Sequence, residues 1–157
     1  MATDDANSRC LYSDDRFTLE AADFCTVPGY LILRVTGGAT HLAGLEPAMA
    51  RALGEALARA SAAIEAATGA ERVYVLSFCE VDRRLHFHLF PRTAWLLEAF
   101  RAATDAGPAD AVDGPALFGW ARAACVPGRA LPAGAPVPAD VATALRTALN
   151  HPIRPSR

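Results

Sequence analysis

The order of apolar and polar residues along the first two thirds of the chain predicts a sheet of short strands. Apolar and polar residues alternate over residues 85–90, which is typical of a strand with one buried face. We expect further strands, rich in β-branched, aromatic and other apolar side chains, at residues 17–20, 29–35 and 72–78. Short loops and turns separate two pairs of these segments, which favours antiparallel neighbours.

A helical repeat lies between the second and third of these strands. Apolar side chains recur near helical spacing at Met49, Leu53, Leu57, Ala60 and Ile64. Pro47 suits the first turn of a helix, and Gly69 suits its end. One long amphipathic helix at about 47–68, combined with the strands, predicts an α+β fold with an antiparallel sheet.

The composition shifts after Arg92. We expect helices at residues 94–103, 116–124 and 138–149, with a Pro/Gly/Ala linker over 127–138. We interpret residues 1–93 as the core, ordered from about residue 10, and residues 94–157 as a helical C-terminal extension of the same domain. Residues 1–15 are polar and are expected to be loose at the start, and the tail that contains Pro152 is expected to fray.

Length and composition indicate a globular protein. The chain has 157 residues, of which 52% are hydrophobic and 20% charged, enough for one compact domain with a real core. The net charge of −2 provides no basic surface for nucleic acid or for an anionic membrane. No apolar run approaches the ~18 residues of a membrane span. We therefore expect neither nucleic acid nor a membrane as a partner.

The N-terminus and the cysteines favour the cytoplasm. The first five residues are acidic and lack the basic-then-apolar order of a signal peptide. The four cysteines are widely spaced and form no CxxC pair: Cys10, Cys25, Cys79 and Cys125. Free thiols in a reducing compartment are the interpretation that fits this spacing.

Two histidines stand out within the alternating segment. His86 and His88 are two residues apart, so on a strand they project from one face with their Cα atoms roughly 6.6 Å apart. An imidazole can act as nucleophile, as acid or base, or as metal ligand near neutral pH. The pair predicts a functional site, although two solvent-facing strand histidines without a role would show the same spacing.

Residues 84–92, RLHFHLFPR, resemble the signature of the histidine-triad (HIT) superfamily of nucleotide hydrolases and transferases. In that signature three histidines alternate with apolar residues, and Pro-Arg often follows; here Arg84 stands at the first histidine. Residues 27–33, VPGYLIL, are similar to the family's Pro-Gly-His strand. The resemblance covers about residues 17–93. It implies a HIT-like α+β fold of five or six antiparallel strands and one long helix, here with extra C-terminal helices.

The resemblance also implies an activity. His86 aligns with the family's nucleophile, which attacks the α-phosphate and carries a nucleotidyl intermediate, and His88 would sit beside the phosphate. Dinucleoside polyphosphates, nucleoside phosphoramidates and adenylylated small molecules are all admissible substrates. The alternative is a catalytically weak or inactive nucleotide-binding module. It is favoured by Arg84 and by residues 77–83, which lack the family's polar amide and glycine, so fewer donors would face the developing charge.

Further residues are candidates for nucleotide or phosphate binding by the same resemblance. Asp23 would bind ribose hydroxyls, although a loop aspartate is commonly only a turn former. Arg84 would place a fixed positive charge near a polyphosphate, or would be an exposed strand-end arginine. Arg92 belongs to the Pro-Arg pair. His41 resembles a common family histidine, but a surface or capping role fits it better, and we interpret Cys79 as an inert thiol.

We expect no metal and no cofactor. The zinc-bearing branch of the family uses CxxC and histidines, whereas this chain has Ser13 and Arg84 at two of the four ligand positions. Family members commonly form two-fold dimers through the helix and a sheet edge, so we expect a homodimer. A third possibility is an interaction protein that exposes an apolar patch on the C-terminal helices, around Trp95, Phe100 and Trp120.

Overall fold

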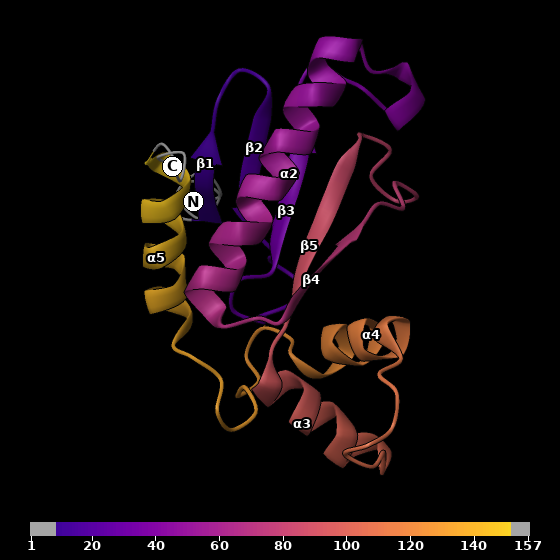
Figure 1. Ribbon diagram of the computed structural model, residues 1–157, viewed down its shortest axis with the longest axis vertical. Coiled ribbons are helices and arrows are strands. Elements are labelled where there is room, and N and C mark those ends of the chain that lie inside the picture. The colour runs from indigo at the N-terminus through magenta and orange to yellow at the C-terminus, as the bar shows by residue number, and fades with distance from the viewer. Residues whose placement is uncertain (1–8, 152–157) are drawn as a thin grey trace.

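The computed structural model describes residues 9–151, which form one antiparallel sheet covered by helices (Figure 1). The strands are β1 (Cys10–Ser13), β2 (Phe17–Ala21), β3 (Leu31–Val35), β4 (Arg72–Leu76) and β5 (His86–Arg92), in the spatial order β1-β2-β3-β5-β4. The helices are the 3₁₀ turn η1 (Leu42–Gly44), α2 (Pro47–Thr68), α3 (Ala94–Thr104), α4 (Gly114–Ala124) and α5 (Pro138–Asn150). The predicted α+β class, the five-stranded antiparallel sheet and the single long helix are confirmed.

The strand β1, which begins at Cys10, was not among the strands predicted from the sequence. It pairs with β2, and the carboxylate of Asp14 closes the turn between them by accepting the backbone N–H groups of Arg16 at 2.9 Å and Phe17 at 2.7 Å. Leu11 is 4% exposed and belongs to the core. A four-residue strand in a polar segment is too short to show a clear apolar alternation, so β1 is recognised only from its pairing with β2. The expected fraying around Pro152 lies outside the described residues.

Two other strand boundaries differ from the prediction for local reasons. Residues 29 and 30 precede β3 because Gly29 adopts a φ of +85° and the N–H of Tyr30 donates to the carbonyl of Val27, forming a turn. Strand β5 runs on to Arg92 through Pro91. Pairing with β3 ends at Leu89, so Pro91 is paired with β4 only, where its missing N–H is tolerated.

The alternation along β5 divides its side chains between two cores. Leu85, Phe87 and Leu89 pack in the cluster that contains α2 and α5. In Figure 1, α2 runs across the sheet and α5 lies beside β1. His86 and His88, which alternate with these residues, belong to the opposite face. The register places His86 beside Arg34 and His88 beside Ile32 of β3.

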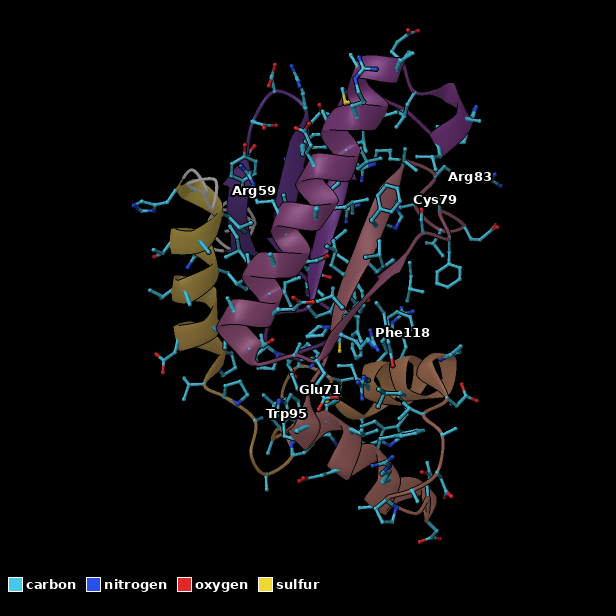
Figure 2. The ribbon with its side chains drawn as sticks, viewed as in Figure 1. Arg59, Glu71, Cys79, Arg83, Trp95 and Phe118 are labelled. Atoms are coloured by element: carbon cyan, nitrogen blue, oxygen red, sulfur yellow. The ribbon has the colours of Figure 1, made fainter. Side chains whose placement is uncertain are left out.

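The helices α3 and α4 pack against one end of that opposite face, below the sheet in Figure 1. Phe118 of α4 is 7% exposed and contacts Phe90 of β5, with their ring centroids 5.2 Å apart. Figure 2 labels Phe118 on the side of α4 nearest the sheet. Trp95 and Phe100 are each 8% exposed and belong to the core, and Trp120 is half-buried against it, so these three side chains do not form the exposed patch that an interaction protein would need.

Within residues 9–151, the longest helices lack the run of apolar residues that crossing a bilayer demands.

Candidate active site

His86 and His88 lie side by side on the face of the sheet that α2 does not cover. Their ring centroids are 5.2 Å apart and their planes meet at 69°. Both line a cavity of about 340 Å³ between the end of the sheet, the β4–β5 loop and α4. The two imidazoles therefore share one hollow, as the alternation of the strand predicts.

The orientation of the His86 ring follows from a main-chain hydrogen bond. Its Nδ1 lies 2.7 Å from the carbonyl oxygen of Arg84. A carbonyl only accepts, so Nδ1 must carry a proton. The neutral ring then has its lone pair on Nε2, the nitrogen that a nucleophile would use. The residue is 7% exposed, and the cavity is its route to a ligand.

His88 is held by a phenol. The hydroxyl of Tyr30 lies 2.8 Å from its Nδ1. Burial raises the pKa of the Tyr30 hydroxyl, which therefore stays protonated. Burial, followed by the nearby His86, Arg122 and Arg34, lowers the pKa of His88 to about 4, so this ring is neutral at pH 7.

A network of charges forms the rim above His86. Arg34, the cross-strand neighbour of His86, donates to the carboxylate of Asp82 at 2.9 Å. Arg84 donates to the same carboxylate through Nε at 2.9 Å and through a terminal nitrogen at 2.7 Å. The hydrogen bonds from Arg84, with the charge of Arg34, hold the pKa of Asp82 far below its usual range. The Asp82 carboxylate is therefore shared by both guanidinium groups.

The remaining wall is aromatic and comes partly from the C-terminal extension. Phe24 lines the cavity, and Phe118 of α4 lies next to His88; each ring centroid is 6.3 Å from the imidazole centroid. Arg122, one turn after Phe118 on α4, also lines the cavity. The site thus combines two imidazoles, two arginines and flat apolar surfaces, which together suit a phosphate attached to an aromatic base.

No family profile and no curated protein matches the sequence. Solved structures do match. A histidine triad protein from Marinobacter aquaeolei VT8 has a TM-score of 0.57 at 13% identity, with 95% of each chain covered. A hypothetical histidine triad nucleotide-binding protein from Sulfolobus tokodaii has a TM-score of 0.56 at 13% identity, covering 90% of this chain and 83% of the other. A zinc-bound histidine triad family protein from Mycobacterium smegmatis has a TM-score of 0.56 at 15% identity, covering 94% of this chain and 87% of the other.

This chain has the histidine-triad fold. Of the five candidate site residues, the fold brings together His86, His88 and the main chain of Arg84. The guanidinium of Arg84 belongs to the rim network, and its side chain is 67% exposed. The position of the first triad histidine therefore supports His86 through a carbonyl and not through a side chain.

Asp23 and Arg92 lie elsewhere on the histidine-triad fold. Asp23 pairs with Arg9 at 2.6 Å, and its neighbour Phe24, not Asp23 itself, lines the cavity. Arg92 pairs with Glu71 at 2.7 Å, six residues along β5 from His86, which corresponds to about 20 Å of strand. Neither contacts the histidine pair, so their binding roles stay predictions without support from the geometry.

The sequence analysis missed Arg34, Tyr30 and Arg122. Arg34 interrupts the otherwise apolar strand β3, which is a readable signal for a polar group facing a site. Tyr30 stands at the histidine of the family's Pro-Gly-His segment. Arg122 follows Phe118 by four residues, a spacing that places both on one helix face, but nothing in the sequence indicates which strand that face approaches.

Cys79 and His41, interpreted from the sequence as an inert thiol and a surface or capping histidine, differ in their distance from the site. Cys79 lies in the β4–β5 loop, labelled in Figure 2, with Sγ 3.7 Å from Nδ1 of His86 and a φ of +53°. His41 is exposed and shares a 2.9 Å hydrogen bond with the hydroxyl of Thr40. His41 does not line the cavity that contains His86.

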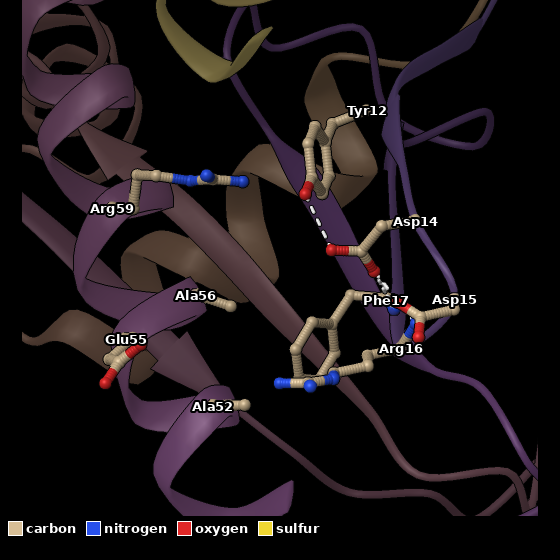
Figure 3. Close-up of a pocket in the computed structure, with 9 residues that line it drawn as sticks. All are labelled: Tyr12, Asp14, Asp15, Arg16, Phe17, Ala52, Glu55, Ala56 and Arg59. Atoms are coloured by element: carbon tan, nitrogen blue, oxygen red, sulfur yellow. Dashed lines mark hydrogen bonds between the residues drawn. The ribbon is translucent and has the colours of Figure 1, made fainter. Parts of the chain in front are cut away.

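A separate hollow of about 260 Å³ lies between the β1–β2 turn and α2 (Figure 3). Three of its polar side chains, Tyr12, Asp14 and Arg59, have internal partners. Tyr12 donates to Asp14 at 2.6 Å, and the guanidinium of Arg59 lies 4.5 Å from the centre of the Tyr12 ring. Because Asp14 also closes the β1–β2 turn, these contacts are explained by the fold and offer no reactive group.

The donor set for a metal is not assembled in the part of the chain that the structure describes. No three His, Cys, Asp or Glu side chains are grouped there as a metal ion requires. Residues 9–151 therefore do not fit a zinc ion of the kind named for the mycobacterial structure.

Proposed function

We propose that the protein is a nucleotide hydrolase or nucleotidyl transferase that acts at the α-phosphate, with His86 as nucleophile. The observation that carries the proposal is the 2.7 Å contact between Nδ1 of His86 and the Arg84 carbonyl, because it assigns the ring's lone pair to Nε2. The histidine-triad fold supports the same assignment. Dinucleoside polyphosphates, nucleoside phosphoramidates and adenylylated small molecules remain the candidate substrates.

The first chemical step forms a bond between Nε2 of His86 and the α-phosphorus. The bond from phosphorus to the leaving group breaks, and the leaving group departs with the electron pair and acquires a proton. The imidazole becomes positively charged, and the Arg84 carbonyl stabilises its Nδ1–H. Water, or another acceptor, then attacks phosphorus, and the phosphorus–nitrogen bond breaks. The proton lost by the attacking water balances the one gained by the leaving group.

His88 would stabilise the phosphate during both steps. With the Tyr30 hydroxyl donating to Nδ1, the neutral ring carries its proton on Nε2. That N–H is a donor for a non-bridging phosphate oxygen, and it adjoins the nucleophile because the two rings are 5.2 Å apart. Preorganised donors of this kind are commonly the largest contribution to stabilising developing charge.

A catalytically weak nucleotide-binding module is the second candidate, and one observation favours it. Ser77, in the segment where the family places its amide, donates its hydroxyl to the main-chain carbonyl of His86 at 2.8 Å. Because this hydroxyl donates to a main-chain carbonyl, it is not a donor for the phosphate, and the segment lacks the donor that the family's amide would supply.

Substitution of His86 separates these two functions. His86→Ala should abolish turnover of an adenylylated substrate and leave nucleotide binding measurable, because the imidazole contributes mainly in the transition state. The assay should include several leaving groups, and His41→Ala is the matched control because His41 is exposed and outside the cavity. Acid quenching of wild type with substrate labelled at the α-phosphate should trap label on the protein. Equal, slow hydrolysis by wild type and His86→Ala across the panel would favour the binding module.

Two earlier expectations accompany this proposal. A homodimer would cover β4, which lies at the edge of the sheet and carries the exposed Val75. A cytoplasmic location would suit four cysteines that are free thiols in the structure.

A further inference from the structure

The cavity at His86 contains one cation without a compensating carboxylate. Arg34 is bridged to Asp82 at 2.9 Å and lies 3.6 Å from Glu20. The other arginine in the lining, Arg122, forms no ion pair within the described residues, and Glu80, which also lines the cavity, is not within ion-pair distance of it. The positive charge of Arg122 is therefore available to a ligand.

Aromatic side chains hold Arg122 in place. Its guanidinium carbon lies 4.9 Å from the centre of the Phe24 ring and 5.5 Å from that of Phe118. Phe118 is fixed in the core, and Phe24 is 38% exposed on the loop before β3. A guanidinium that contacts aromatic faces keeps its in-plane N–H donors free, and this planar fork matches the oxygens of a phosphate. Arg122 is thus oriented before any ligand arrives.

We propose that Arg122 binds a phosphate of the substrate, so that helix α4 of the C-terminal extension completes the active site. The ligands it selects are nucleoside phosphates over uncharged nucleosides. The proposal rests on the proposed function only in that the ligand of the His86 cavity is a nucleotide. The imidazoles of His86 and His88 would contact the reacting phosphate, while Arg122 supplies a permanent positive charge.

The electrostatic influence of Arg122 reaches the histidine pair. Arg122 is among the groups that lower the pKa of His88, after burial and His86. Phe118 and His88 are in ring contact at 6.3 Å, and Arg122 lies over Phe118, so the cation and the imidazole flank one aromatic ring. A phosphate beside His88 would therefore lie within the field of Arg122.

Binding of nucleotides and of their nucleosides to the full chain tests this role. AMP with adenosine and GMP with guanosine would be titrated calorimetrically into wild type and Arg122→Gln. The dissociation constant of the monophosphate should rise about ten- to a hundredfold in Arg122→Gln, the usual range for losing a charge-assisted hydrogen bond, and nucleoside affinity should stay unchanged. Arg122→Lys should recover part of the loss, because it restores charge without the planar fork.

Arg51→Gln is the matched control for the change of charge. Arg51 is exposed on α2, which packs on the other face of the sheet, and its substitution should leave all four affinities unchanged. Equal monophosphate affinity in wild type and Arg122→Gln would overturn the proposal. A parallel loss of nucleoside and monophosphate affinity would also overturn it, since that is the result of a purely structural role. Failure of wild type to bind either monophosphate would overturn it as well.

The same variants distinguish this proposal from the catalytic one. If His86→Ala and wild type hydrolyse a substrate panel equally slowly, but monophosphate binding depends on Arg122, the catalytic proposal fails and the phosphate-binding role of Arg122 stands. If turnover depends on His86 but Arg122→Gln leaves both KM and monophosphate affinity unchanged, the role of Arg122 fails alone.

Discussion

At the scale of single residues, the two histidines differ in what their Nδ1 atoms contact. His86 contacts a carbonyl, which fixes a proton on Nδ1, whereas His88 contacts the Tyr30 hydroxyl, which can donate to it. With the Tyr30 hydroxyl donating, Nε2 of His88 would carry the proton, whereas Nε2 of a neutral His86 ring carries the lone pair. In the proposed mechanism, one strand thus supplies both the nucleophile and an adjacent hydrogen-bond donor for the phosphate.

The lowered pKa of His88 predicts a pH dependence of stability. The usual pKa is 6.5 and the folded value is about 4. Between these values the unfolded chain takes up a proton that folded His88 refuses, so the free energy of unfolding should fall as the pH drops from 6.5 towards 4. Urea denaturation across this range should show a smaller fall in His88→Gln than in wild type.

The exposed His41 provides the control for that prediction, since His41→Gln should follow the wild-type curve. The pKa of His88 is lowered first by burial and then by the nearby His86, Arg122 and Arg34. If the free energy of unfolding falls equally in wild type and His88→Gln, His88 is not the source of the pH dependence.

At the scale of elements, periodicity predicted the helices and strands that single segments form. It did not predict the contacts between segments that are distant in sequence. The apolar repeat of α2 and the alternation of β5 established those elements and the common face of His86 and His88. The approach of Arg34 to His86 depends on the register between β3 and β5, and that of Arg122 depends on how α4 docks. Neither relation is local, so a single sequence did not reveal either.

The turn before β3 depends on the close approach of Gly29 to α2. Gly29 has a φ of +85°, and a Cβ atom there would lie 2.5 Å from Cγ2 of Thr68. Gly29→Ala should lower the free energy of unfolding by about 2 kcal/mol through backbone strain and overpacking. Chemical denaturation followed by circular dichroism measures this change.

A second substitution separates the two causes. Thr68→Ser removes Cγ2 but keeps the hydroxyl that donates to the Ile64 carbonyl at 2.7 Å. In a Gly29→Ala background it should recover the steric part of the loss and leave the strain. A Gly29→Ala protein as stable as wild type would contradict the argument.

At the scale of the whole molecule, the C-terminal extension shares both cores of the sheet. Helix α5 packs against β1 and α2, and Asn150 donates to the carbonyl of Leu11 at 3.0 Å. Phe100 of α3 and Phe118 of α4 lie in one cluster with Tyr30 and Phe90. That residues 94–157 belong to the same domain as the core stays a prediction, and it can be tested by unfolding.

Cooperative unfolding is the expected consequence. Both tryptophans of the chain lie in the extension, Trp95 on α3 (Figure 2) and Trp120 on α4, so their fluorescence reports on that part alone. Circular dichroism reports on the whole chain. The two signals should give one coincident transition in urea. Separate midpoints would show that the extension unfolds as an independent unit.

The carbonyl that holds His86 has a consequence for how such proteins are found. Every amino acid carries a main-chain carbonyl, so the support that Arg84 gives to His86 leaves no mark in the one-letter sequence. A sequence pattern that requires three histidines does not match this chain, although the ring of His86 is held by the Arg84 carbonyl. For genome surveys, a pattern of two histidines on one strand, combined with a tyrosine at position 30 and an arginine on the α4 face, would retrieve sequences of this kind.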